Sequence, residues 1–135
     1  MNSKYFKAHE LVPKHIYNKY GEKSFKFIHK DIIAVIDRLK EHFNLGTMTI
    51  NNYAWGGDRE WSGLRTINSP YYSETSQHSL GNAIDAVFSH YTAEEVRNYI
   101  IDNPHLFPEI KGIELCVSWL HIDVRNEDEL VLFKA

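Results

Sequence analysis

The sequence predicts a single α+β domain, in which helices pack on one side of a small antiparallel sheet. An amphipathic helical pattern over residues 24–43 and several short strand-like segments, most of them later in the chain, predict this fold class. The length of 135 residues, with 43% hydrophobic and 24% charged residues, suits one hydrophobic core. Because no linker, repeat or low-complexity tract divides the chain, we expect one domain over residues 1–135.

Three segments have the features of helices. Residues 9–20 are expected to form a short helix that is interrupted near Pro13. Apolar residues at intervals of three and four predict a longer helix over 24–43, closed by the segment 44–46. A third helix is expected over 92–103, where a threonine and a glutamate three residues later form a capping box.

Short β-branched or alternating segments predict the strands, at residues 47–52, 83–88, 112–117, 119–125 and 130–133. Between the first two lies a long irregular segment, residues 53–80. Loops of this length inside a compact domain are uncommon and are often functional. We therefore expect the chemistry of the protein at the edges of this segment.

Composition excludes several classes of function. A net charge of −3 and a pI near 6.2 give no basic surface for a nucleic-acid partner. No apolar run is long enough for a membrane helix, and the N-terminus lacks a signal-peptide core, so we expect a soluble chain made in the cytoplasm. Cys116 is the only cysteine, which excludes an internal disulfide and a cysteine-rich zinc site, and we expect it in the core. Any metal must then be held by histidine and carboxylate.

One constellation has the residue types of a metal site. His78 ends the long irregular segment, Gly81 allows a turn, and Asp85 follows within a strand whose other residues are largely apolar. His121 lies in a later strand, where it alternates with apolar residues. If these two strands are neighbours, His78, Asp85 and His121 converge as a catalytic zinc set that leaves a fourth position for water. The remaining histidines are expected to be surface or hydrogen-bonded residues: His9, His15, His29, His42, His90 and His105.

These motifs resemble those of the zinc D-Ala-D-Ala carboxypeptidases and L-alanyl-D-glutamate endopeptidases, whose fold is shared with the hedgehog signalling domain. Residues 76–85 match the pattern Ser-x-His-x-x-Gly-x-Ala-x-Asp at every specified position, and residues 119–125 resemble the later ligand strand. Residues 62–65 are similar to the Ser-Gly-x-Arg of the family, and residues 9–13 to the opening of its short phage-type members.

The resemblance implies that His78, Asp85 and His121 bind Zn²⁺ and that the activity is peptide-bond hydrolysis in the stem peptides or cross-links of bacterial peptidoglycan. It leaves open whether the enzyme is a carboxypeptidase or an endopeptidase. We expect a monomer that acts on the cell wall after release from the cytoplasm or as part of a phage particle. The alternative is a catalytically inactive, zinc-stabilised binding or virion module on the same fold.

The general base is the point at which the sequence departs from many relatives. Relatives often place a carboxylate three residues before the last ligand, and Ser118 occupies that position here. Glu114 is the preferred candidate, because a tight turn after its strand would bring it beside His121. Asp123 is the second candidate, although it lies where it could instead support His121 or pair with the following arginine.

Two further positions bear on substrate binding. Arg65 is a candidate for holding a substrate carboxylate or the developing oxyanion, because its guanidinium suits either anion. Trp119 occupies the position at which relatives often carry a second histidine, so it could donate one hydrogen bond or wall the pocket. Aromatic residues of the long segment are expected either to line a substrate groove or to pack that segment: Tyr53, Trp55, Trp61, Tyr71 and Tyr72.

Overall fold

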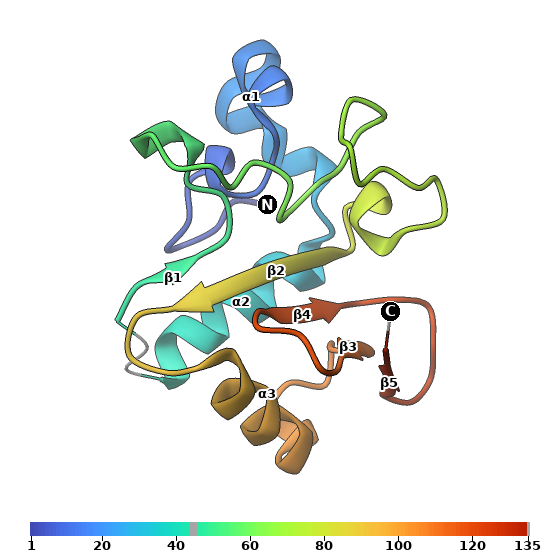
Figure 1. Ribbon diagram of the computed structural model, residues 1–135. Coiled ribbons are helices and arrows are strands. Elements are labelled where there is room, and N and C mark those ends of the chain that lie inside the picture. Colours follow the sequence, from blue (N-terminus) through green and yellow to red (C-terminus); the bar gives the residue numbers. More distant parts are fainter. Residues whose placement is uncertain (44–45, 135) are drawn as a thin grey trace.

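The structure is a computed structural model, and it describes residues 1–43 and 46–134. It has mixed helix and sheet, as predicted (Figure 1). The α-helices are α1 (Lys14–Tyr20), α2 (Lys30–His42) and α3 (Ala93–Asp102). The strands are β1 (Met48–Thr49), β2 (Ala83–Phe88), β3 (Gly112–Glu114), β4 (Leu120–Asp123) and β5 (Val131–Phe133). None of the helices in these described ranges is long and apolar enough to cross a membrane.

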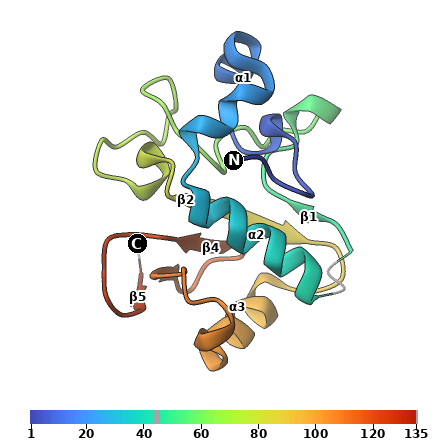
Figure 2. The ribbon, with the colours of Figure 1, turned by 180° about the vertical axis from the view of Figure 1, so that it is seen from behind.

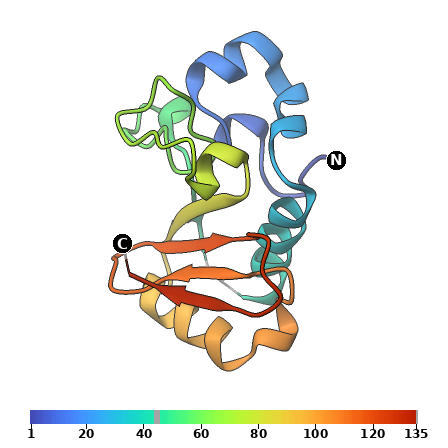
Figure 3. The ribbon, with the colours of Figure 1, turned by 90° about the vertical axis from the view of Figure 1, so that its right-hand side faces the viewer.

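The five strands form one sheet in the order β1-β2-β4-β3-β5. The neighbouring pairs are antiparallel, except that β5 runs parallel to β3. The prediction of a purely antiparallel sheet is therefore wrong at this edge. The cause is the connection after β4, which carries the chain past β3 before β5 pairs on its far side (Figure 3).

The long helix predicted over residues 24–43 is shorter than expected. Residues Gly21–Phe27 form a 3-10 helix, and α2 begins only at Lys30. His29 is its N-cap, and the Nδ1 atom of His29 accepts a hydrogen bond from the backbone N–H of Asp31. Apolar residues that precede Lys30 are still buried in the core. The regular spacing of buried residues therefore extends further towards the N-terminus than the α-helix itself. The predicted closure at 44–46 involves residues 44 and 45, which lie outside the described ranges.

The other helix predictions agree more closely with the structure. The segment 9–20 is interrupted near Pro13, which is the N-cap of α1, and a 3-10 helix, Ala8–Glu10, precedes it. α3 begins with the predicted capping box, in which Thr92 and Glu95 bond to each other's backbone N–H groups.

Several strands are shorter than predicted, and this changes the environment of the cysteine. The strand expected over 112–117 ends at Glu114. Cys116 then lies in the turn between β3 and β4, with a positive φ of 64° and an exposed side chain. The prediction that Cys116 belongs to the core is wrong, because the turn directs it to the surface.

The helices α2 and α3 pack on the apolar face of the sheet. Figures 1 and 2 show α2 behind β2 and β4 in one view and in front of them in the opposite view. Apolar residues of both helices belong to the same buried cluster as Ile84, Ile113, Leu120 and Ile122 of the strands. Because side chains alternate along a strand, the residues between these four face the other side of the sheet. That side carries the candidate site.

Candidate metal centre and its pocket

Three neighbouring strands place polar side chains in one row across the sheet. β2 and β4 are antiparallel neighbours, and Asp85 is paired directly with His121. The condition set by the sequence analysis is therefore met. The register of β3 against β4 pairs Ile113 with Ile122, so Glu114 comes next to His121 on the other side of it. Asp85, His121 and Glu114 thus share the face of the sheet opposite the core.

A short 3-10 helix, Gln77–Leu80, brings His78 to the same place. Its N-cap is Ser76, whose Oγ accepts a hydrogen bond from the backbone N–H of His78 at 3.2 Å. Gly81 ends this helix with a left-handed φ of 74°, and a Cβ atom at this position would overlap the carbonyl oxygen of Phe27. The serine and glycine of the motif therefore have a local role in shaping the turn that carries His78.

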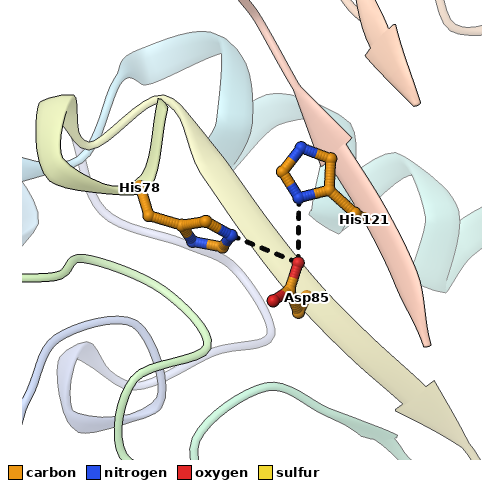
Figure 4. A group of neighbouring side chains, drawn as sticks. All are labelled: His78, Asp85 and His121. Atoms are coloured by element: carbon orange, nitrogen blue, oxygen red, sulfur yellow. Dashed lines mark hydrogen bonds and ion pairs between the residues drawn. The ribbon is translucent and has the colours of Figure 1, made fainter. Parts of the chain in front are cut away.

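The imidazole rings of His78 and His121 both face the same carboxylate oxygen of Asp85 (Figure 4). The Oδ1 atom of Asp85 lies 3.2 Å from Nε2 of His78 and 3.0 Å from Nδ1 of His121. One donor atom from each residue lies within 4.8 Å of the other two, and all three residues are buried. His78, Asp85 and His121 could therefore hold a metal ion. No other group of this kind occurs in the described ranges, 1–43 and 46–134.

Each imidazole has a hydrogen-bond partner on its other ring nitrogen. Nδ1 of His78 lies 2.9 Å from the backbone oxygen of Gly63, so Nδ1 carries the proton and donates, leaving the Nε2 lone pair for a ligand. Nε2 of His121 lies 2.7 Å from Oδ2 of Asp123, which leaves Nδ1 as the atom directed at Asp85. Partners of this kind fix the orientation of metal-binding histidines.

Asp123 is fully buried and has two cationic partners. Besides its contact with His121, it accepts hydrogen bonds from Nε and Nη2 of Arg125 at 2.8 and 2.7 Å. Burial by itself raises the pKa of Asp123, but the hydrogen bonds from Arg125 and His121 outweigh it and lower the pKa to about 2. In the metal-free protein, burial lowers the pKa of His121, while hydrogen bonds with Asp123 and Asp85 raise it to about 9.

Asp85 also contacts two arginines. Nη2 of Arg65 lies 3.2 Å from Oδ2 of Asp85, and Nη2 of Arg59 donates to its backbone oxygen at 3.2 Å. Burial opposes ionisation of Asp85, but hydrogen bonds with His121 and His78 hold its pKa well below the ordinary value. Burial also lowers the pKa of both arginines, and Asp85 partly offsets this effect.

The triad lines a pocket with a volume of about 490 Å³. Its other walls include Arg59, Arg65, Tyr71, Glu114, Trp119 and Phe133. Glu114 is only 8% exposed, and its carboxylate accepts no hydrogen bond from any residue in the described part of the chain. A carboxylate in this position, beside a possible metal site, is the type of group that serves as a general base in hydrolysis.

Trp119 also lines this pocket. Its indole Nε1 atom is buried and has no acceptor among the described residues. The backbone oxygen of Trp119 is held at 2.6 Å by Nη2 of Arg97, which also donates to the oxygen of Val117 at 2.8 Å. Arg97 comes from α3, is 4% exposed, and pairs with no carboxylate in the described ranges. The turn that leads into β4 is therefore anchored from the opposite face of the sheet.

The structure divides the aromatic residues of the long segment into two groups. Trp61 and Tyr71 lie near the site, whereas Tyr53 and Trp55 pack around His9. Tyr72 is exposed and belongs to neither group. Sequence reasoning missed Arg59, Arg97 and Phe133. Phe133 could be assigned to the site only from its parallel pairing with Glu114, and predicting that pairing requires knowledge of the strand order. No spacing in the sequence indicates that Arg59 or Arg97 belongs to the site.

No protein-family model, no curated protein and no solved structure matches this chain.

Proposed function

We propose that this protein is a zinc peptidase that hydrolyses peptide bonds in the stem peptides or cross-links of bacterial peptidoglycan. One observation carries the proposal: two imidazole nitrogens and a carboxylate oxygen converge in a pocket that also holds a separate buried carboxylate, Glu114. A purely structural metal site requires the ligand set but does not require a separate buried carboxylate such as Glu114. The resemblance of residues 76–85 and 119–125 to the zinc peptidases of peptidoglycan supports the same substrate class.

The donor set fits zinc. Two histidines and one carboxylate are the protein ligands of a known class of catalytic zinc sites, in which a fourth position stays open. The contacts of His78 with Gly63 and of His121 with Asp123 fix one ligating nitrogen on each ring. When bound there, zinc would act as a Lewis acid and lower the pKa of a water molecule towards neutrality.

The residues of the chain have distinct roles in this proposal. Glu114 accepts the proton of the attacking water and passes it to the leaving amine, because it is buried in the pocket and next to His121 in the sheet. Asp123 orients His121 and stays ionised, since its two oxygens accept hydrogen bonds from Arg125 and from His121. Arg65 places a positive charge beside Asp85, where it can stabilise the oxyanion or hold a substrate carboxylate.

The substrate carbonyl oxygen also needs a hydrogen-bond donor on the side away from Arg65. Trp119 lines the pocket and its indole N–H lacks an acceptor among the described residues, but this N–H is itself buried, so the ring would have to turn for it to donate to the substrate. Trp119 would donate without carrying a charge, so most of the stabilisation of negative charge falls to Arg65. We propose that the enzyme acts on the cell wall, after release from the cytoplasm or as part of a phage particle.

The test is digestion of purified peptidoglycan by the zinc-loaded protein, followed by mass spectrometry of the released peptides. The wild type should release peptides, and Glu114→Gln should abolish release while keeping about one zinc per chain. Loss of zinc in a His78→Ala, His121→Ala double variant identifies the ligands. Zinc binding without cleavage of several wall types would refute the enzyme and favour a zinc-stabilised binding module.

A further inference from the structure

Arg97 of α3 is a buried cation whose hydrogen bonds go to one turn of the backbone. It is 4% exposed, and its Nη2 atom donates to the backbone oxygens of Val117 and Trp119 at 2.8 and 2.6 Å. It pairs with no carboxylate among residues 1–43 and 46–134, and its Nε atom is buried without an acceptor there. Burying an unpaired charge is costly, and an apolar side chain of similar volume often stabilises a core at least as well. Stability of the core alone therefore does not explain an arginine at this position.

The turn that Arg97 holds, residues 115–119, connects two parts of the candidate site. β3 ends at Glu114 directly before this turn, and His121 follows it in β4. The pairing of β3 with β4 runs through Gly112 and Ile113, so it ends one residue before Glu114. The position of Glu114 relative to His121 consequently depends on the turn as well as on the sheet.

Contacts from outside the turn are needed to fix its shape. Cys116 has a φ of 64°, in a left-handed region that residues other than glycine adopt rarely and at an energetic cost. Residues 115–118 also line a groove of about 1000 Å³, so little packs against the turn on that side. The amide of Leu115 donates to the backbone oxygen of Phe133 at 2.7 Å and holds the start of the turn. Its end is held by Arg97, the only side chain in the described ranges that hydrogen-bonds to the backbone of this turn.

We propose that Arg97 is a positioning residue, which ties the end of the turn to α3 and thereby fixes the proposed general base Glu114 relative to the proposed metal ligand His121. This inference rests on the proposed function, and it adds a residue that does not line the metal pocket and therefore acts through the turn. The ligands themselves lie in β2, in β4 and in the 3-10 helix Gln77–Leu80. Loss of Arg97 should therefore move the base more than the ligands.

The first test compares Arg97→Met, which has an unbranched chain but no donor, with Arg97→Lys, which keeps the charge. In the zinc-loaded protein, Arg97→Met should lower kcat on a soluble peptidoglycan fragment by about 10–100-fold, because small displacements of a catalytic group have effects of this size. KM and zinc affinity should change by less than about threefold. Arg97→Lys should recover part of the lost kcat, because its ammonium group can still donate to the turn.

Glu109→Gln is the matched control for stability. Glu109 binds both terminal nitrogens of Arg38, away from the site, so this variant should lose stability and keep its kcat. If Arg97→Met does not fold, Arg97→Lys takes its place and must lower kcat while zinc affinity is kept. An unchanged kcat, or a loss of zinc affinity as large as the loss of kcat, would overturn the inference.

Amide hydrogen exchange gives a second readout that does not need activity. In Arg97→Met the Leu115 amide should exchange at least about tenfold faster, because the turn opens locally. The Val124 amide, which donates to the oxygen of Asn82 at 3.0 Å, should keep its rate. Equal exchange at Leu115 in variant and wild type would overturn the inference. If Leu115 exchanges faster but the wild type cleaves no peptidoglycan, the proposed function fails and the tether between Arg97 and the turn stands.

Discussion

Replacing Asp123 with asparagine would separate the positioning of the proposed metal ligand His121 from the proposed proton transfer. The buried carboxylate of Asp123 accepts hydrogen bonds from His121 at 2.7 Å and from two nitrogens of Arg125 at 2.7 and 2.8 Å. An asparagine has nearly the same shape, but it offers only one oxygen and presents an NH₂ group to these donors. Asp123→Asn therefore leaves at least one donor without an acceptor and removes the negative charge between two cations.

The size of each effect follows from these contacts. Breaking a fully buried ion pair costs about 3–5 kcal/mol. The side chain of Arg125 is 23% exposed and can turn to water, so we expect a lower loss of about 1–3 kcal/mol in the free energy of unfolding. Loss of a partner that orients a metal-binding histidine typically weakens metal binding by about 10–100-fold. With zinc at saturation, kcat should fall by less than about tenfold, because Glu114 remains in place.

The assay measures zinc affinity by competition with a chelator, stability by urea unfolding, and kcat at saturating zinc. Glu109→Gln is a matched control, because Glu109 binds both terminal nitrogens of Arg38 away from the site. That control should lose stability and keep its zinc affinity. The reasoning is refuted if Asp123→Asn keeps the zinc affinity of the wild type and loses kcat by more than about 100-fold, since Asp123 would then be the proton acceptor.

Further outcomes are expected at Arg65, His121 and Gly81. Arg65→Ala should lower kcat/KM by about 100-fold with little change in zinc content, and an unchanged rate would remove its assigned role. Because contacts with two carboxylates outweigh burial and raise the pKa of His121 to about 9, zinc binding at pH 7 should release a proton, and zinc affinity should rise with pH up to about 9. Calorimetry in buffers of different ionisation enthalpy measures this release. In the zinc-free protein the same contacts stabilise the fold fully below about pH 6.5, and this contribution is lost as the pH rises through about 9. Gly81→Ala should destabilise the protein by at least about 2 kcal/mol in urea unfolding, because its Cβ overlaps the carbonyl oxygen of Phe27. Gly56→Ala should cost less, since Gly56 has a similar φ of 86° with open space around it.

Much of the candidate site could be predicted because it depends on alternation along two strands. Asp85 and His121 each interrupt an apolar pattern, and this alone indicates that they share a non-core face once β2 and β4 are paired. The position of Arg59 could not be predicted in the same way. Arg59 reaches the site through an irregular segment, where no period relates sequence position to side-chain direction.

The elements of the fold also divide into those that the sequence could predict and those that it could not. The helix α3 was predictable from its capping box, because the signal is local to Thr92 and Glu95. The parallel pairing of β5 depends on how the chain passes β3, and no local signal in the sequence records this path. Residues 21–27 show a third case, since a 3-10 helix and an α-helix can bury apolar residues at similar intervals.

Because Asp85, His121 and Glu114 form one row across three strands, binding of a metal ion there would depend on the correct alignment of those strands. If β4 slipped by one residue against its neighbours, His121 would turn into the core and Leu120 or Ile122 would face the pocket. The same slip would therefore disrupt both the set of metal ligands and the apolar face of the sheet. A bound ion would consequently favour the native alignment over every slipped one, so that the residues proposed for catalysis would also select the correct fold during assembly of the sheet.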